Sequence, residues 1–257
     1  MAEESIPAAE ETFVSHLIEL RNRLVKASLG LVVVLIGLMI WPGPAAIYDF
    51  LAQPMLASLP PNTKMIATGV IAPFMVPMKV AFLAAFILAL PWIFYQMWAF
   101  VAPGLYQHEK RLVLPLVISS SLLFIIGVAF SYFLVFGRVF AFIYGFSPQS
   151  ITVAPDIENY LDFVMSMCLA FGLTFEVPVV VVVLVRMGIV ELEKLKKIRP
   201  YVIVGAFVIA AVVTPPDAIS QLALAIPMCL LYELGLLIAP LFGRLTQAPQ
   251  ETGKAEQ

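Results

Sequence analysis

Charged side chains are scarce in this sequence. Only 12% of its 257 residues are Asp, Glu, Lys or Arg, about half the share of an ordinary soluble domain. Apolar residues make up 61% of the chain, and the mean hydropathy is +0.98. A water-soluble fold could not cover so much apolar surface with so few charges. The composition therefore excludes a soluble globular enzyme and a disordered chain, and it indicates a polytopic membrane protein.

Positive charge, cysteine and histidine are also in short supply. The net charge is −2, so no basic field attracts nucleic acid. The two cysteines, Cys168 and Cys229, lie in long apolar stretches, which argues against a disulfide framework and against metal-ligand spacing. His16 and Glu19 are three residues apart, but the only other histidine is the distant His108. We therefore expect no metal site.

Common catalytic motifs are missing as well. The sequence contains no HExxH, GxSxG, GxxxxGK[ST] or GxGxxG pattern. We therefore expect no enzyme activity and no cofactor. The acidic, polar start MAEESIPAAEET lacks the basic and apolar regions of a cleaved secretory signal peptide, so no such signal is expected.

Long apolar runs are what the sequence does contain. A helix needs about 20 mostly apolar residues to cross a bilayer, and six runs predict spans at residues 27–48, 80–102, 112–137, 163–185, 201–213 and 218–240. The fifth run extends only about 20 Å as a helix, so it must thin the bilayer locally or pack against its neighbours. Proline breaks or bends helices, so WPGP at 41–44 is expected to end the first span and Pro91 to kink the second.

The segments between the spans differ in basic charge. We expect loops at 49–79 and 147–162 on one side of the membrane, and the link 104–111 and the amphipathic segment 187–200 on the other side, together with both termini. This second side and its edges hold 12 of the 15 basic residues, and the first side keeps only Lys64, Lys79 and Arg138. Because basic residues concentrate in cytoplasmic segments, the sequence predicts that both termini are cytoplasmic.

The segment before the first span, residues 12–26, is predicted to be an amphipathic helix. Its apolar stripe consists of Phe13, Leu17, Leu20 and Leu24. Glu19 and Arg23 are four residues apart with the acid first, which favours an ion pair. One interpretation is an anchor helix at the membrane surface with a solvated ion pair. The alternative is that Glu19 is a docking carboxylate.

A second carboxylate faces the same side of the membrane. Glu109 is the only acid in the link 104–111. Two carboxylates at one membrane face would each bind a guanidinium through paired hydrogen bonds. The alternative is simple charge balance between Glu109 and its neighbours Lys110 and Arg111.

Three acids lie in or beside the later spans. Glu176 is near the middle of the fourth span, where an ionised carboxylate is costly, so it is a functional candidate. The alternative is a neutral acid that hydrogen-bonds to a neighbouring helix. Glu233 lies in the sixth span, and Asp217 in TPPD is suited to cap that helix. An ion-coupled secondary transporter using Glu176 and Glu233 would be expected to carry internal repeats, and none is visible in the sequence.

Five long and unusual strings stand along the chain: HLIELRNRL at 16–24, YQMWAFVAPGLYQHEKR at 95–111, FGLTFEVPV at 171–179, RPYVIVGAF at 199–207 and TPPDAISQLALAIP at 214–227. Together and in this order they resemble the TatC family, the multispanning, signal-recognising subunit of the twin-arginine protein translocase. The resemblance extends from about residue 12 to about residue 240. It implies an all-α bundle of six transmembrane helices, concave and glove-like, with short fifth and sixth helices and both termini cytoplasmic.

The same resemblance implies a site and a function. The signal-binding residues of the family fall on Glu19, Arg21, Arg23, Leu24, Pro91, Phe100 and Glu109, and further candidates on Pro54, Tyr132, Glu176 and Asp217. The implied function is to bind paired-arginine signal peptides of folded precursor proteins and to scaffold a translocase driven by the proton gradient. The implied partners are small single-span subunits of the TatA and TatB type, precursor proteins, the lipid bilayer and further copies of the chain.

We therefore expect a single membrane domain over residues 1–257 in the bacterial inner membrane. It consists of a cytoplasmic segment 1–26, a six-helix bundle 27–240 and a cytoplasmic tail 241–257.

Overall fold

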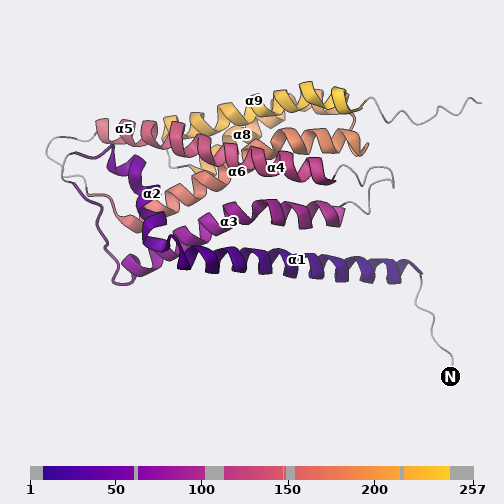
Figure 1. Ribbon diagram of the computed structural model, residues 1–257. Coiled ribbons are helices and arrows are strands. Elements are labelled where there is room, and N and C mark those ends of the chain that lie inside the picture. Colours follow the sequence, from indigo (N-terminus) through magenta and orange to yellow (C-terminus); the bar gives the residue numbers. More distant parts are fainter. Residues whose placement is uncertain are drawn as a thin grey trace, which may run out of the picture.

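The computed structural model describes residues 8–60, 63–101, 113–146, 148, 154–214 and 217–243, with the backbone alone for 8–13, 242 and 243. Within these residues every regular secondary-structure element is a helix, which confirms the all-α class (Figure 1). The helices are α1 (Ala8–Ile40), α2 (Pro44–Leu56), α3 (Ala72–Val101), α4 (Val113–Phe130), the π-helix η3 (Ser131–Phe136), α5 (Gly137–Gly145), α6 (Ile157–Arg186), α7 (Leu192–Lys197), α8 (Arg199–Val213) and α9 (Ala218–Gly243).

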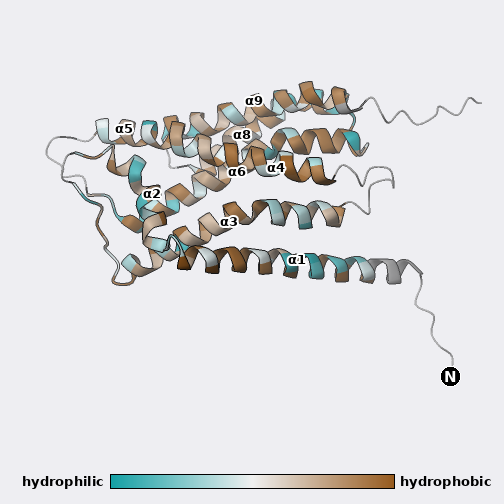
Figure 2. Cartoon of the chain, viewed as in Figure 1, coloured by the Kyte–Doolittle hydropathy of each residue, from teal (hydrophilic) through white to brown (hydrophobic). Residues whose placement is uncertain are grey.

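Five of the described helical segments are long and apolar enough to cross a membrane: Val14–Ile40, Ala72–Val101, Val113–Gly145, Ile157–Arg186 and Ala218–Leu241. The helix α8 is apolar but shorter, at 15 residues. Five long helices and one short helix agree with the six predicted spans and with the short fifth one. The expectation of a short sixth helix was wrong, because α9 has 26 residues. Hydropathy colouring shows apolar residues along all of these helices (Figure 2).

Several predicted helix ends differ from the observed ones by half a helical turn to several turns. The predicted surface helix at 12–26 and the first span form one continuous helix, α1, which ends just before the WPGP segment as expected. The third helix along the chain, α3, begins at Ala72 rather than at residue 80 and runs through Pro77 and Pro91. Charges near a helix end do not stop the helix, because long side chains reach the membrane surface.

The helix α6 also begins earlier than predicted, at Ile157 instead of residue 163. Its first turn is capped by Asp156, whose side chain accepts hydrogen bonds from the backbone amides of Glu158 and Asn159 at 3.0 and 3.1 Å. An Asp at this position satisfies amides that have no partner within the helix. The end of the second predicted loop is therefore the start of a helix.

The helix α6 is the centre of the bundle and packs against α4 on one side and α9 on the other. Small residues allow these close approaches, as is common between membrane helices. Gly127 of α4 faces the backbone of Phe171, and Gly172 of α6 faces the ring of Phe124. A Cβ atom at either glycine would meet these neighbours, so both positions require the absence of a side chain.

The helix α1 lies at one edge of the bundle and packs along α3. Gly30 sits against the ring of Trp92, whose Nε1 donates a hydrogen bond of 2.8 Å to the carbonyl of Lys26. The helices α8 and α9 pack together at the opposite edge. The helices thus form an open array, in keeping with the expected concave bundle.

The two ends of the bundle differ in their elements. The start of α1 and the end of α9 lie at the same end, which we call the termini end (Figure 1). The helices α2 and α5 lie at the opposite end, which we call the far end. There the two connections meet, because Ile66 pairs with Asp156 in an isolated β-bridge and Thr68 donates two hydrogen bonds to the same aspartate.

Candidate functional site

A polar cluster joins α1 to α3 near the termini end. Arg23 Nη2 donates to Glu19 Oε1 at 3.3 Å, so the predicted ion pair of these two residues is present. Arg23 Nη1 donates to Gln96 Oε1 of α3, also at 3.3 Å. Gln96 is only 3% exposed, whereas Glu19 and Arg23 are partly exposed. The guanidinium of Arg23 therefore links an accessible carboxylate to a buried amide.

An aromatic contact continues this cluster toward the end of α3. The ring of His16 stacks on the ring of Phe100 with 4.4 Å between centroids and 23° between planes. His16 lies about one helical turn before Glu19, and Phe100 about one turn after Gln96. The structure thus brings Glu19, Arg23 and Phe100 to one patch, which we call the α1–α3 patch and define as His16, Glu19, Arg23, Gln96 and Phe100.

The other predicted residues of this region face outward. Leu24 is 65% exposed, and Arg21 is exposed with a hydrogen bond of 3.3 Å to Asn22. Pro91 is exposed on α3 beside Trp92. The apolar stripe of α1, including Leu17 and Leu20, is likewise exposed in the described part of the molecule. Glu109 lies outside the described residues.

Glu176 occupies the middle of α6 and is 8% exposed. The hydroxyl group of Ser120 on α4 lies beside the carboxyl group of Glu176. Neither Glu176 Oε1 nor Ser120 Oγ has a hydrogen-bond partner of good geometry among the described residues. Buried polar atoms without partners are costly, so Glu176 remains a functional candidate in the structure.

The remaining acids of the last two spans have partners. Glu233 Oε2 forms an ion pair with Arg199 Nη2 at 2.8 Å, which joins α9 to α8. Asp217 Oδ2 accepts from the amide of Ser220 at 2.7 Å, in the manner of a helix cap. The prediction that Asp217 caps the helix of the sixth span is therefore confirmed.

Two further candidates lie at the far end, away from the α1–α3 patch. The Tyr132 hydroxyl donates to the Phe50 carbonyl at 2.7 Å, and the two rings stack at 5.2 Å. Pro54 lies inside α2, and its carbonyl accepts from the Ser58 hydroxyl at 2.9 Å. Tyr132 thus fastens the short helix α2, which contains Pro54, to the third span.

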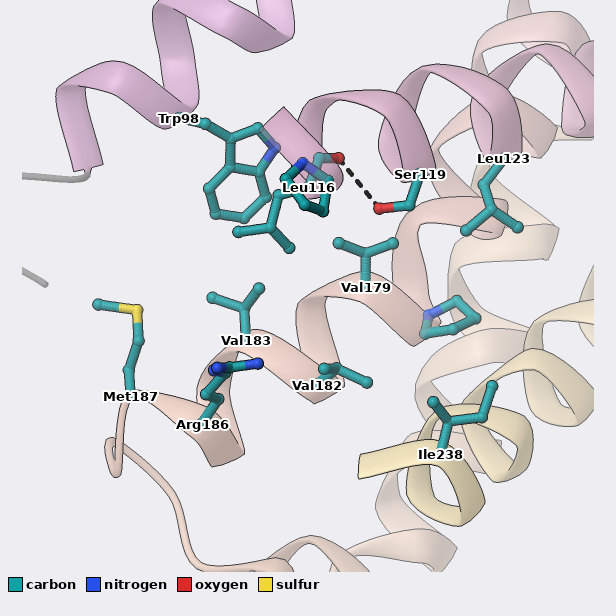
Figure 3. A pocket seen from close by; sticks show the side chains of 12 residues that line it. Trp98, Leu116, Ser119, Leu123, Val179, Val182, Val183, Arg186, Met187 and Ile238 are labelled. Carbon is teal, nitrogen blue, oxygen red and sulfur yellow. Dashed lines mark hydrogen bonds between the residues drawn. The ribbon is translucent and has the colours of Figure 1, made fainter. Parts of the chain in front are cut away.

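An apolar pocket of about 310 Å³ opens between α3, α4, α6 and α9 (Figure 3). Trp98 and Leu116 line one side of it, and Val179 and Val183 of α6 line the other. Arg186 and Met187 lie at its edge toward the end of α6. The mostly apolar lining offers contact to an apolar group.

Sequence reasoning missed Gln96 and His16. Gln96 is the only amide or charged side chain between Val80 and Ala102, and a lone amide in an apolar run is a signal that it has a specific partner. His16 carried no comparable signal, because its contact with Phe100 depends on how α1 packs against α3. Among the residues that the structure describes, no group of three potential metal ligands is found.

The fold and the α1–α3 patch define a polytopic helical membrane protein with a polar site at the end of its first two long helices. The sequence model of the family described as Sec-independent protein translocase protein (TatC) matches residues 15–227. The chain belongs to this TatC family. The alternative of an ion-coupled secondary transporter is therefore set aside.

Relatives and solved structures agree with this membership. The chain is 47% identical to TatC of Haemophilus influenzae over 229 residues, which are 89% of each chain. It is 48% identical to TatC of Escherichia coli K12 over 226 residues, which are 88% of this chain and 87% of that protein. A crystal structure of the twin arginine translocase receptor TatC matches with a TM-score of 0.76 and 36% identity, covering 88% of this chain and 99% of that one.

Proposed function

We propose that the chain is the receptor subunit of a twin-arginine translocase and binds paired-arginine signal peptides of folded precursor proteins. In this proposal it works as a non-enzymatic scaffold for a translocase driven by the proton gradient. The signal-binding residues are Glu19, Arg21, Arg23, Leu24, Pro91, Phe100 and Glu109.

The single observation that carries the proposal is the state of Glu19. Its carboxylate is partly exposed and already binds a guanidinium, that of Arg23, at 3.3 Å. A group that holds one guanidinium has the charge and the hydrogen-bond acceptors to hold another. The exposed apolar residues of α1 beside it, such as Leu20 and Leu24, would contact the apolar part of a signal peptide.

We further propose an orientation in the membrane and a set of partner subunits. Both termini face the cytoplasm of a bacterium, since 12 of the 15 basic residues fall in the sequence segments, and at their edges, that are predicted to share the side of the termini. The chain acts as one membrane domain in the inner membrane and assembles with single-span subunits of the TatA and TatB type and with further copies of itself. Copurification of such subunits in mild detergent tests the assembly.

The test of signal recognition is peptide binding to the detergent-solubilised full chain. Glu19→Ala and Glu109→Ala should each weaken binding of a paired-arginine peptide about tenfold to hundredfold, because hydrogen bonds to charged groups contribute about 1.5–3 kcal/mol. Glu19→Lys should be worse, because like charges then repel the incoming arginines. The matched control is Glu193→Ala, which removes an exposed acid that forms an i,i+3 ion pair on α7.

The affinity is measured beside the thermal stability of each variant. Unchanged affinity in the Glu19→Ala, Glu109→Ala double variant would remove both acids from the site. Glu19 would then be an ordinary ion-pair residue on a helix surface.

A further inference from the structure

The guanidinium of Arg23 is held from two sides, and this arrangement bears on how a ligand reaches Glu19. Two different nitrogens of Arg23 donate to two acceptors at the same distance of 3.3 Å, one on α1 and one on α3. Charge-assisted hydrogen bonds are commonly about 2.7–2.9 Å long, so neither contact is tight. Arg23 therefore pairs with Glu19 through a long contact.

The second acceptor, Gln96, has properties that the ion pair does not need. It is 3% exposed and lies in an otherwise apolar stretch of α3. A buried amide oxygen that loses its donor remains unsatisfied, which is costly. Gln96 therefore favours keeping Arg23 beside α3 whether or not Glu19 holds it as well.

Displacement of Arg23 creates a specific electrostatic difficulty. An arginine of a ligand that binds Glu19 would lie next to the guanidinium of Arg23, and two like charges repel. A neutral acceptor that retains Arg23 on the α3 side reduces this repulsion. Gln96 suits that task, because its amide oxygen accepts from Arg23 and carries no net charge that would compete with Glu19 for the ligand.

We propose that Arg23 is an internal substitute for a signal-peptide arginine and that Gln96 is the positioning residue that retains Arg23 when the ligand takes its place at Glu19. This inference rests on the proposed function. It also predicts selectivity, because a ligand must displace a bound guanidinium. A ligand arginine offers a planar fork for the carboxylate, whereas a lysine offers only a point charge.

Two substitutions of Gln96 with opposite expected effects test the inference. Gln96→Met keeps the size of the side chain but removes the amide acceptor, so Arg23 competes for Glu19 and paired-arginine peptide should bind about tenfold more weakly. Gln96→Glu offers Arg23 a second carboxylate and frees Glu19, so the same peptide should bind several-fold more tightly. Gln53→Met, on an exposed position of α2 at the far end, is the matched control.

The measurement is the Kd of a synthetic paired-arginine peptide and of its paired-lysine counterpart for the full chain in detergent, with the thermal stability of each variant. A rise in Kd for Gln96→Met and a fall for Gln96→Glu, both larger for the arginine peptide, would support the inference. Equal Kd values in all forms would overturn it. Weaker binding in both variants together with lower stability would also overturn it, because Gln96 would then only support the fold.

Failure of this inference is distinguishable from failure of the proposed function. If the Glu19→Ala, Glu109→Ala double variant retains the preference for arginine over lysine, the proposed function itself is wrong. If the double variant loses that preference while both Gln96 variants bind like the unmodified chain, only the retention of Arg23 by Gln96 is wrong.

Discussion

The acidic residues in and beside the last membrane spans differ in their interaction partners. Glu233 is paired with Arg199, and Asp217 caps a helix. Asp217 Oδ1 and Glu176 Oε1 are both buried without a hydrogen-bond partner in the described part of the chain. Glu176 differs in its place, because it lies within the span α6 and forms neither an ion pair nor a helix cap with the described residues. A polar atom in this position is costly, and the polar group that lies beside it is the Ser120 hydroxyl of α4.

The prediction at this position separates polarity from proton exchange. Glu176→Gln should retain transport, because Gln keeps hydrogen-bonding capacity at similar size. Glu176→Ala should lower transport, because Ala has no hydrogen-bonding group, and should lower stability by about 2 kcal/mol, because it leaves a cavity where a buried side chain packed. Transport at matched protein levels and thermal unfolding measure the two effects. A Gln variant that fails as badly as the Ala variant would indicate proton exchange, and full activity in both would make Glu176 dispensable for transport.

Several pairs of helices pack closely where one of them has a glycine, and the packing of α1 on α3 depends on such a contact at Gly30. A Cβ atom at Gly30 would overlap the ring of Trp92, which is fixed by its hydrogen bond to Lys26. Gly37 lies on the same helix with no atom within 4 Å of the corresponding position. The two glycines therefore form a matched pair.

Gly30→Ala should weaken the packing of α1 on α3 and lower the free energy of unfolding by about 1–3 kcal/mol, as overpacking does. Gly37→Ala should be neutral or stabilise by up to about 1 kcal/mol, because Ala favours the helix. Thermal unfolding of the purified chain in detergent checks both. Similar stability in the two variants would show that α1 does not need its close approach to Trp92.

The start of α6 carries a titratable cap outside the membrane-spanning segments. The hydrogen bond from the Thr68 hydroxyl, followed by those from the amides of Asn159, Thr68 and Glu158, lowers the pKa of Asp156. Because this pKa is lower in the folded chain than in the unfolded chain, the carboxylate stabilises the fold at neutral pH. That contribution is lost as the pH falls through the folded-state value.

Asp156→Asn should therefore lower the melting temperature at neutral pH, and its difference from the unmodified chain should shrink in acid. Thermal unfolding between about pH 3 and pH 7 covers the range in which an aspartate titrates. The control is Asp162→Asn on the same helix, where Lys79 lies 3.9 Å from an exposed carboxylate. A difference that does not depend on pH would show that the charge of Asp156 is unimportant.

At the scale of the whole molecule, the start of α1 and the end of α9 share one end of the bundle, while α2 and α5 lie at the other (Figure 1). An even number of crossings produces this arrangement. The distribution of Lys and Arg predicts that the termini end is cytoplasmic.

Thiol labelling in sealed cells tests the orientation. In a background without Cys168 and Cys229, a cysteine at Val70 should react with an impermeant reagent added outside, and a cysteine at Lys194 should not. Both positions are accessible in the described structure, Val70 with 98% exposure and the Lys194 side chain with 69%. Labelling of the Lys194→Cys variant alone would reverse the proposed orientation, and labelling after the cells are opened is the control.

The sequence by itself determined the class of the protein and the number of its spans, because a run of apolar residues long enough to cross a bilayer has few other stable states. It also determined the Glu19–Arg23 pair, since residues four apart are neighbours on any helix. Helix ends were harder to predict, because Asp156 caps α6 with hydrogen bonds that apolar runs do not encode.

Only the tertiary structure decided which distant residues meet. Arg23 reaches Gln96, His16 stacks on Phe100 and Tyr132 bonds to Phe50 across more than 70 residues of chain. Each contact depends on which helices pack together and at what height. Those choices follow from the fit of glycines, aromatic rings and small residues over whole helices, since lipid tails give apolar side chains no preference for one another.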